Sequence, residues 1–218
     1  MKKPNEILEI EKRYKIELKE TKQIDDLTIY TGKKNVYMFD ESKDIIGLNL
    51  CNNNLFEVPD LINFKSLEIL NLSENKISKI EDLKELQYLT TLRLSGNQIS
   101  RIENLGELQN LTNLNLFNNK ISRIENLREL QNLTNLDLGG NQISKIENLG
   151  ELQNLINLNL FNNQISKIEN LEKLQNLTKL RLSGNQISNI KNLENLENLE
   201  NLILNNNKIL RIENLGEL

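Results

Sequence analysis

A unit of 22 residues is repeated along most of this chain of 218 residues. It has the form L-x-x-L-x-L-x-x-N-x-I-x-x-I-x-x-L-x-x-L-x-x, and its copies begin at Ile45, Leu67, Leu89, Leu111, Leu133, Leu155, Leu177 and Leu199. The seven apolar positions of the unit hold Leu, Ile, Val or Phe in all eight copies. A fixed period of roughly 20 to 50 residues is typical of a solenoid, in which each unit buries its apolar face only against its neighbours. The period therefore predicts a stack of repeats.

The ninth position of the unit is Asn in every copy. We place it where the chain leaves a strand and turns, so that nearby backbone groups lose their strand partners. An amide side chain carries both donors and acceptors and can replace those partners. We therefore expect a structural ladder formed by Asn53, Asn75, Asn97, Asn119, Asn141, Asn163, Asn185 and Asn207.

These residues resemble the leucine-rich repeat family over residues 45–218. The 22-residue length and the second half of the unit, as in Ile121-Ser-Arg-Ile-Glu-Asn-Leu127, look like the class that includes a regulatory subunit of protein phosphatase 1. Bacterial internalin-like repeats are similar. The resemblance implies an α/β-type solenoid, a right-handed horseshoe or arc with a concave parallel sheet of about eight strands. It also implies a convex side of 3-10 or short helical turns, but no particular activity.

We interpret residues 1–44 as an N-terminal cap and residues 45–218 as the eight repeats, the last one incomplete. Apolar residues at spacings of three and four predict an amphipathic helix within residues 5–20. They are Ile7, Ile10, Tyr14 and Leu18. Such a helix would cover the open end of the solenoid, because a terminal repeat otherwise exposes its core. A dimerisation or docking helix is the alternative.

Three β-prone runs, separated by polar residues, follow this segment: 27–30, 36–39 and 45–50. Two such runs joined by a short polar linker predict a hairpin, and its second strand would be the first repeat strand. A similar leading hairpin caps many leucine-rich repeat proteins, so the resemblance supports the capping role.

The composition argues against catalysis. The chain has no His, which excludes His-based acid–base catalysis, catalytic triads and His-containing metal sites within it. No glycine-rich phosphate-binding motif is present. We therefore predict a protein that is not an enzyme, with no catalytic residues, no cofactor and no metal.

The net charge of −4 gives no electrostatic reason to expect nucleic acid or an anionic membrane as partner. The single Cys fits a reducing compartment, and the charged start does not resemble a signal peptide. We expect a cytoplasmic protein that binds another protein or peptide and neither nucleic acid nor membrane.

Alternate residues of a strand point to opposite faces, so positions 3, 5 and 7 of the unit face the concave surface. Residues that break the template at positions 5 and 7 are candidates for partner contact, and aromatic residues and Arg are enriched in binding hot spots. The alternative is drift in a recently duplicated array. The candidates are Arg93, Phe117, Asp137, Gly139, Phe161, Arg181 and Ile203.

One arrangement of these candidates would make a slot. Phe117 and Phe161 would be its walls, Gly139 and Gly140 its floor, and Asp137 its carboxylate, which suits a Lys or Arg of a partner. Arg93 and Arg181 would then engage acidic groups on either side of that basic residue. The alternative is that both rings fold over the glycines and leave no slot.

Together these features favour a non-enzymatic protein–protein interaction scaffold that binds on its concave face. A recognition domain of a larger signalling protein, such as a Roco-type GTPase, is the alternative. An internalin-like adhesin is a less favoured alternative, because this chain has Ile-Glu-Asn-Leu where internalins have Ile-x-Pro-Leu. Because Leu215 and Leu218 end the eighth repeat without a polar cap, we also expect self-association through this C-terminal repeat.

Overall fold

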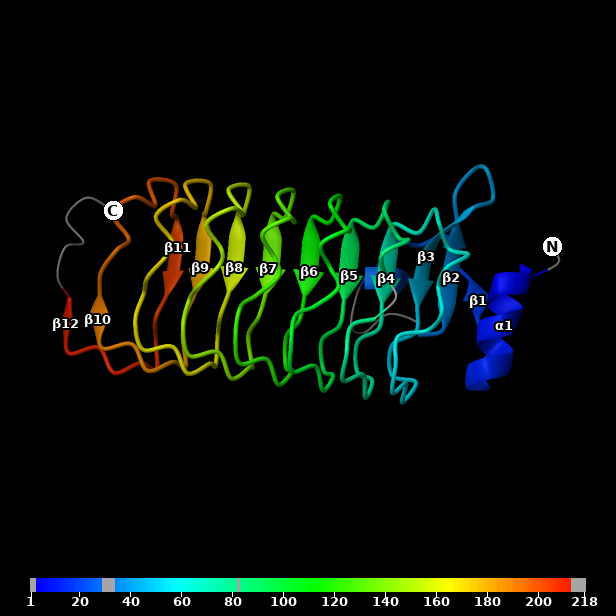
Figure 1. The fold of residues 1–218 in the computed structure, drawn as a ribbon, viewed down its shortest axis with the longest axis horizontal. Coiled ribbons are helices and arrows are strands. Elements are labelled where there is room, and N and C mark those ends of the chain that lie inside the picture. Colours follow the sequence, from blue (N-terminus) through cyan, green and yellow to red (C-terminus); the bar gives the residue numbers. More distant parts are fainter. Residues whose placement is uncertain (1–2, 29–33, 82, 213–218) are drawn as a thin grey trace.

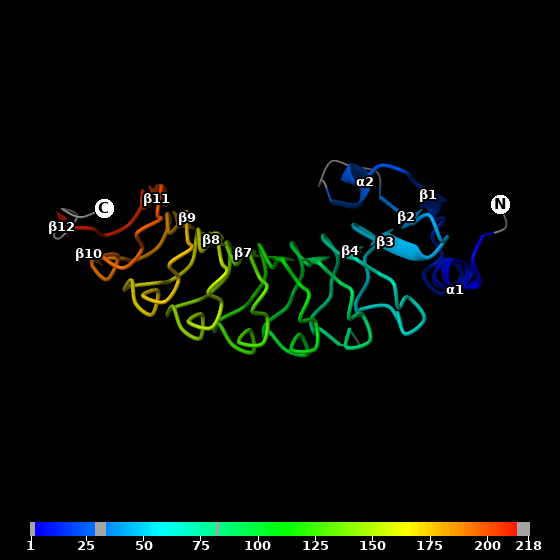
Figure 2. The same ribbon diagram turned by 90° about the horizontal axis from the view of Figure 1, so that it is seen from above.

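The computed structural model describes residues 3–28, 34–81 and 83–212 of the chain. The described residues form an elongated arc with strands along one side and turns along the other (Figures 1 and 2). The N-terminal helix α1 (Asn5–Tyr14) lies at one end of the arc, and the short strands β10 (Asn189–Ile190) and β12 (Arg211–Ile212) lie at the other.

Each repeat contributes one short strand to a single sheet. These strands are β3 (Ile45–Asn49), β4 (Ile69–Asn71), β5 (Thr91–Arg93), β6 (Asn113–Asn115), β7 (Asn135–Asp137), β8 (Asn157–Asn159), β9 (Lys179–Arg181) and β11 (Asn201–Ile203). Neighbouring repeat strands pair in parallel with an offset of one repeat, so that Leu92, Leu114 and Leu136 stand side by side. The predicted parallel sheet of about eight repeat strands is confirmed.

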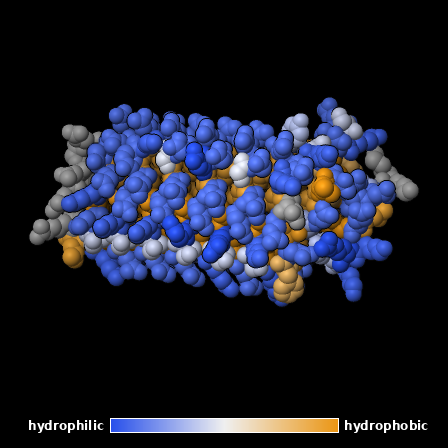
Figure 3. Space-filling model, in the orientation of Figure 1, coloured by the Kyte–Doolittle hydropathy of each residue, from blue (hydrophilic) through white to orange (hydrophobic). Residues whose placement is uncertain are grey.

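The apolar positions of the repeat form one continuous core. In the fourth repeat Leu114 and Leu116 point inward from the strand side, and Ile121, Ile124 and Leu127 meet them from the returning segment, all buried. Full burial of such a side chain contributes about 1.5 to 3 kcal/mol relative to its exposure. In the face drawn in Figure 3, polar side chains lie in rows with apolar atoms between them.

The convex side consists of turns, and no helix is assigned there among the described residues. Each turn closes with a bond of the 3-10 type, such as those from the Leu130 N–H to the Leu127 carbonyl (2.9 Å) and from the Leu133 N–H to the Leu130 carbonyl (3.0 Å). Because successive bonds are three residues apart and not one, they form isolated turns and not a continuous helix. Asn126, one residue before the first turn, has a left-handed φ of 57°, which prevents a helix from starting earlier.

The predicted N-terminal helix is present but shorter than residues 5–20. α1 (Asn5–Tyr14) ends at Lys15, which has a left-handed φ of 55°. Ile7 and Ile10 are buried in the same cluster as the first repeats, so α1 covers this end of the core. Leu18 is also fully buried but lies beyond the helix, where its N–H donates to the Glu11 carboxylate (2.6 Å).

The predicted hairpin is formed by β2 (Val36–Phe39), which pairs antiparallel with β3, and the linker is closed by a bond from the Asp40 N–H to the Asp44 carbonyl (3.0 Å). β1 (Lys19–Glu20) extends the sheet by pairing in parallel with β2.

The β-prone run 27–30 is not a strand in its described part. Leu27 and Thr28 end the short helix α2 (Asp25–Thr28), and Ile29 and Tyr30 lie outside the described residues.

Burial decreases toward the C-terminal end. Leu202, Leu204 and Ile209 are only half-buried, whereas the equivalent residues of the inner repeats are buried. β10 (Asn189–Ile190) and β12 (Arg211–Ile212) form a small parallel pair there. Leu215 and Leu218, on which the expected self-association depends, lie outside the described residues.

Candidate binding groove on the concave face

Five position-5 side chains form one row across the middle of the sheet. The strand register aligns them from β5 to β9 in the order Arg93, Asn115, Asp137, Asn159 and Arg181. Together with the position-3 residues beside them, they line a groove of about 330 Å³. The structure thus brings together three of the predicted site residues, the two arginines and the aspartate.

Asp137 is the centre of this row and is half-buried. Its Oδ1 accepts hydrogen bonds from the Gly139 N–H (3.0 Å) and from Asn159 Nδ2 (3.0 Å). Among the described residues no hydrogen bond is made to Oδ2. Burial raises the pKa of Asp137, although these two hydrogen bonds and the charges of Arg181 and Arg93 oppose the shift. Among the described residues no Lys or Arg nitrogen lies within 4.0 Å of this carboxylate.

Arg93 and Arg181 flank the aspartate at two strands' distance on either side. Arg93 is half-buried, and its Nε is buried without a hydrogen-bond partner among the described residues. Burial lowers the pKa of Arg93, and Asp137 opposes that shift. Arg181 is exposed, with Lys179 beside it on β9. Within the described residues neither arginine has a carboxylate within 4.0 Å.

The expected slot between two aromatic walls is not present. A Cβ added at Gly139 would lie 3.2 Å from Phe117 Cδ2, and one added at Gly140 would lie 3.4 Å from Phe117 Cε2. The Phe117 ring therefore covers both glycines, as the alternative arrangement expects of this ring. Phe161 is more than one-third exposed (38%). Neither ring lines the groove, and Ile203 on β11 lies outside it as well.

The concave face of the first two repeats is already occupied by the chain itself. α2 lies over β3 and β4 on the strand side of the arc (Figure 2). Asn71 Nδ2 donates to the Leu27 carbonyl (3.2 Å), and Asn49 Nδ2 donates to the Asp26 carbonyl (2.6 Å). The Leu27 side chain is fully buried above Gly47, where an added Cβ would collide with Leu27 Cδ1. The free concave surface thus begins at β5.

Sequence reasoning missed this covered region. The available signal was Gly47, since position 3 of every later repeat carries a side chain. A glycine in a strand marks a site where another part of the chain approaches closely.

From Asn75 to Asn207 the position-9 asparagines make hydrogen bonds both within their own repeat and to the preceding one. Asn53 of the first repeat donates instead to Asn35 Oδ1 and to the Cys51 carbonyl. Asn119 is a typical member: its Nδ2 donates to the carbonyls of Leu94 (2.9 Å), Leu116 (3.1 Å) and Phe117 (3.3 Å). Its Oδ1 accepts the Ile99 N–H (3.0 Å). One side chain thus satisfies four backbone groups.

Two further asparagine ladders were not predicted. At position 16, left-handed asparagines donate to a carbonyl of the preceding repeat, as in Asn126 Nδ2 to the Ile102 carbonyl (2.7 Å). At position 22, Asn132 Nδ2 donates to the Gln109 carbonyl (2.9 Å). The signal was the repetition of Asn at both positions. The members are Asn104, Asn126, Asn148, Asn170 and Asn192, and Asn110, Asn132, Asn154, Asn176 and Asn198.

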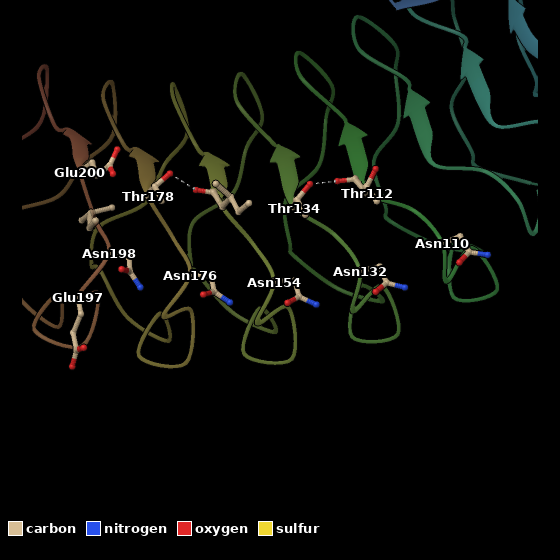
Figure 4. Close-up of a pocket in the computed structure, with 12 residues that line it drawn as sticks. Asn110, Thr112, Asn132, Thr134, Asn154, Asn176, Thr178, Glu197, Asn198 and Glu200 are labelled. Atoms are coloured by element: carbon tan, nitrogen blue, oxygen red, sulfur yellow. Dashed lines mark hydrogen bonds between the residues drawn. The ribbon is translucent and has the colours of Figure 1, made fainter.

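A second, larger groove of about 830 Å³ runs along the edge where the strands begin. Figure 4 shows its row of asparagines at the turns and its row of threonines before the strands. Each asparagine and threonine of these two rows already donates one hydrogen bond to a backbone carbonyl, as in the bond from Thr134 Oγ1 to the Thr112 carbonyl (3.1 Å). The groove has no charged residue in its central part, so the concave groove is the stronger candidate.

The described residues contain no group of three side chains that could hold a metal ion. None of the described helices is long and apolar enough to cross a membrane.

Parallel strands on one side, turns on the other and asparagine ladders between repeats define a β-solenoid scaffold. The chain belongs to the leucine-rich repeat family. A family model described as Leucine Rich repeats (2 copies) matches residues 89–129, 131–173 and 175–217, and a second, described as Leucine rich repeat, matches residues 47–99. Proteins of this family generally bind other proteins.

Several solved structures are similar. A leucine-rich repeat protein of Leptospira interrogans matches 96% of the chain with a TM-score of 0.75 and 27% identity, and the chain spans 53% of that protein. Internalin C2 of Listeria monocytogenes matches 82% of the chain with a TM-score of 0.72 and 31% identity, and 82% of its own length is covered. A second Listeria monocytogenes internalin, of the F type, matches 85% of the chain with a TM-score of 0.62 and 32% identity, over 63% of its length. The comparison with curated proteins gives no match.

Proposed function

We propose that this chain is a non-enzymatic scaffold that holds a segment of another protein in the concave groove between β5 and β9. The observation that carries the proposal is the packing of α2 on the same face. Asn71 at position 5 of the second repeat binds a main-chain carbonyl of that segment. The chain thus contains an example of a peptide segment held by position-5 side chains.

The groove offers the same kind of contact to an external segment. Asn115 occupies the position that Asn71 has two repeats earlier, and its Oδ1 likewise accepts an N–H of its own turn, that of Phe117 (3.0 Å). No hydrogen bond from its Nδ2 is found among the described residues. Because a half-buried amide donor without a partner is unfavourable, a hydrogen bond from Asn115 Nδ2 to a carbonyl of a bound chain would stabilise the complex.

The test is a selection of random linear peptides on the purified protein, followed by binding measurements on two variants. Asp137→Arg adds a long cation to the middle of the groove and fits the fold, because Arg93 and Arg181 occupy the equivalent position of their repeats. Glu200→Arg makes the same change of charge at an exposed residue of the second groove. We expect selected peptides to lose binding to Asp137→Arg and to keep it with Glu200→Arg. Unchanged binding to Asp137→Arg would refute the proposal.

An internalin-like adhesin is the second candidate, and the similarity to two Listeria internalins at 31% and 32% identity favours it. An adhesin would lie outside the cell, whereas an intracellular scaffold would lie in the cytoplasm. Protease treatment of intact cells that express the full-length protein separates the two, since only an adhesin is digested from outside. We propose the cytoplasm, on the single half-buried Cys51. A Roco-type origin stays a hypothesis.

A further inference from the structure

We infer that the concave groove selects a segment with an acidic residue, a basic residue and a second acidic residue at intervals of three, lying along the solenoid across β5 to β9. The inference rests on the proposed function and adds the chemical class of the segment. It follows from the order of charges along the position-5 row, from the spacing of the strands and from the donors and acceptors that lack partners.

The spacing comes first. Arg93 and Asp137 stand in the same row with one strand between them, and Asp137 and Arg181 repeat this relation. At about 4.8 Å per strand, each pair is separated by ~10 Å. A segment in the polyproline II conformation has three residues per turn and advances about 3.1 Å per residue, so residues three apart lie on the same side and ~9 Å from each other. A segment that crosses the strands can therefore present one side chain to each of the three charges.

The central residue of the segment should be basic. Asp137 Oδ2 has no hydrogen bond among the described residues, and its Oδ1 is held by the Gly139 N–H and Asn159 Nδ2, which fix the carboxylate in place. A half-buried carboxylate without a cation is stabilised by a Lys or Arg that replaces its lost water.

The two outer residues of the segment should be acidic. Arg93 lines the groove and has no carboxylate within 4.0 Å among the described residues, so an acidic side chain of the segment would pair with its guanidinium. At the other end Arg181 and Lys179 stand on the same strand. With these three cations and one carboxylate the groove has a net charge of +2 (3 − 1), which favours a ligand of net negative charge.

The groove is closed at one end, which sets where the segment lies. α2 covers β3 and β4, and the exposed Lys34 next to this covered region lines a small cavity of about 170 Å³ together with Arg93. An acidic residue at Arg93 therefore marks the last position of the segment on the concave face. The pattern reads the same from both ends and fixes no chain direction.

The probes are three labelled peptides of equal length. The first carries Glu-Ser-Thr-Lys-Thr-Ser-Glu, the second carries Lys-Ser-Thr-Glu-Thr-Ser-Lys, and the third has the composition of the first with its three charges adjacent. We expect the first to bind about tenfold more tightly than the other two in fluorescence anisotropy at low ionic strength, which corresponds to ~1.4 kcal/mol. Equal binding of the first and third, or binding of none, overturns the inference.

A charge exchange gives the second test. Asp137→Lys should weaken the first peptide and strengthen a variant with Glu in place of its central Lys, while Glu200→Lys should change neither. The peptides selected from the random library distinguish a failure of this inference from a failure of the proposed function. If they depend on Asp137 but lack the charge pattern, the inference fails and the proposed function stands. If they are indifferent to Asp137→Arg, both fail.

Discussion

The Phe117 ring lies against Gly139 of the next repeat, so closely that a Cβ at residue 139 would stand 3.2 Å from Phe117 Cδ2. The same Cβ would lie 3.2 Å from Asn159 Nδ2 and 3.3 Å from Asp137 Oδ1. The missing side chain thus makes room for the aromatic ring on one side and for the hydrogen bond between Asn159 and Asp137 on the other. Gly139, which was predicted to contact a partner, does not line the groove but leaves space beside it.

We predict that Gly139→Ala destabilises the protein by about 1 kcal/mol, because the methyl group overpacks a closed contact. In a Phe117→Ala background the same substitution should cost less, since one of the three close neighbours is gone. Denaturant unfolding of the four proteins in this double-mutant cycle measures the coupling. A coupling energy of zero would show that the ring does not restrict residue 139.

The second prediction concerns the asparagine ladders. Asn119→Ala should destabilise the protein by about 2 kcal/mol or more, because the buried Ile99 N–H loses its acceptor and three carbonyls each lose one of their two hydrogen bonds. Asn132→Ala removes one exposed bond and should cost about 1 kcal/mol at most. Thermal or denaturant unfolding compares the two. Equal losses would contradict the structural role assigned to position 9.

A third prediction links stability to pH through Asp137. Its pKa is raised in the folded state, chiefly by burial, so the folded protein disfavours the charged carboxylate. The destabilising effect is therefore present above the folded-state pKa and is relieved as the pH falls through it, because the folded state takes up the proton first.

Asp137→Asn should accordingly raise the unfolding midpoint at neutral pH, and its advantage over the wild type should shrink in acid. Asn fits this position, as Asn115 and Asn159 show on the adjacent strands. Denaturant unfolding at several pH values gives the measurement. The same variant should bind the acidic–basic–acidic peptide more weakly, whereas a pH-independent difference would contradict the assignment to Asp137.

A fourth prediction tests the covered region. Gly47→Ala adds a methyl group that would collide with Leu27 Cδ1, and Leu27 is enclosed by Val36, Ile69 and Met38. We expect α2 to loosen while the repeats remain folded. Hydrogen exchange should accelerate at the Leu27 amide, which donates to the Ile24 carbonyl (3.0 Å), and stay slow at Leu114. Unchanged exchange at Leu27 would show that α2 adapts without leaving the sheet.

The fold was largely predictable because the same 22-residue pattern that sets the local structure of a repeat also sets its contacts with the neighbouring repeats. Every contact of an inner repeat is with a copy of itself, so the period fixes the parallel register, as for Leu92 beside Leu114. The inward direction of positions 4 and 6 follows from the alternation of strand side chains, and Leu114 and Leu116 are buried accordingly. The antiparallel hairpin of β2 and β3 was predictable from its local turn.

The groove was only partly predictable for the opposite reason. Strand alternation puts Arg93, Asp137 and Arg181 on one face, and the register aligns them, so their proximity could be inferred from spacing alone. The direction of a side chain at the end of a strand depends on its neighbours. Phe117 lies over Gly139 because that glycine leaves space, and no periodicity encodes the choice of rotamer.

The amino-acid sequence by itself determined the solenoid, its strand register, its buried leucines and the row of charges on the concave face, since all of these follow from a strict period. Only the tertiary structure decided which part of that face is free. The packing of α2 on β3 and β4 is a contact between a non-repeated segment and the array. Such a contact depends on matching shapes and unpaired hydrogen-bonding groups that meet only when the chain has folded.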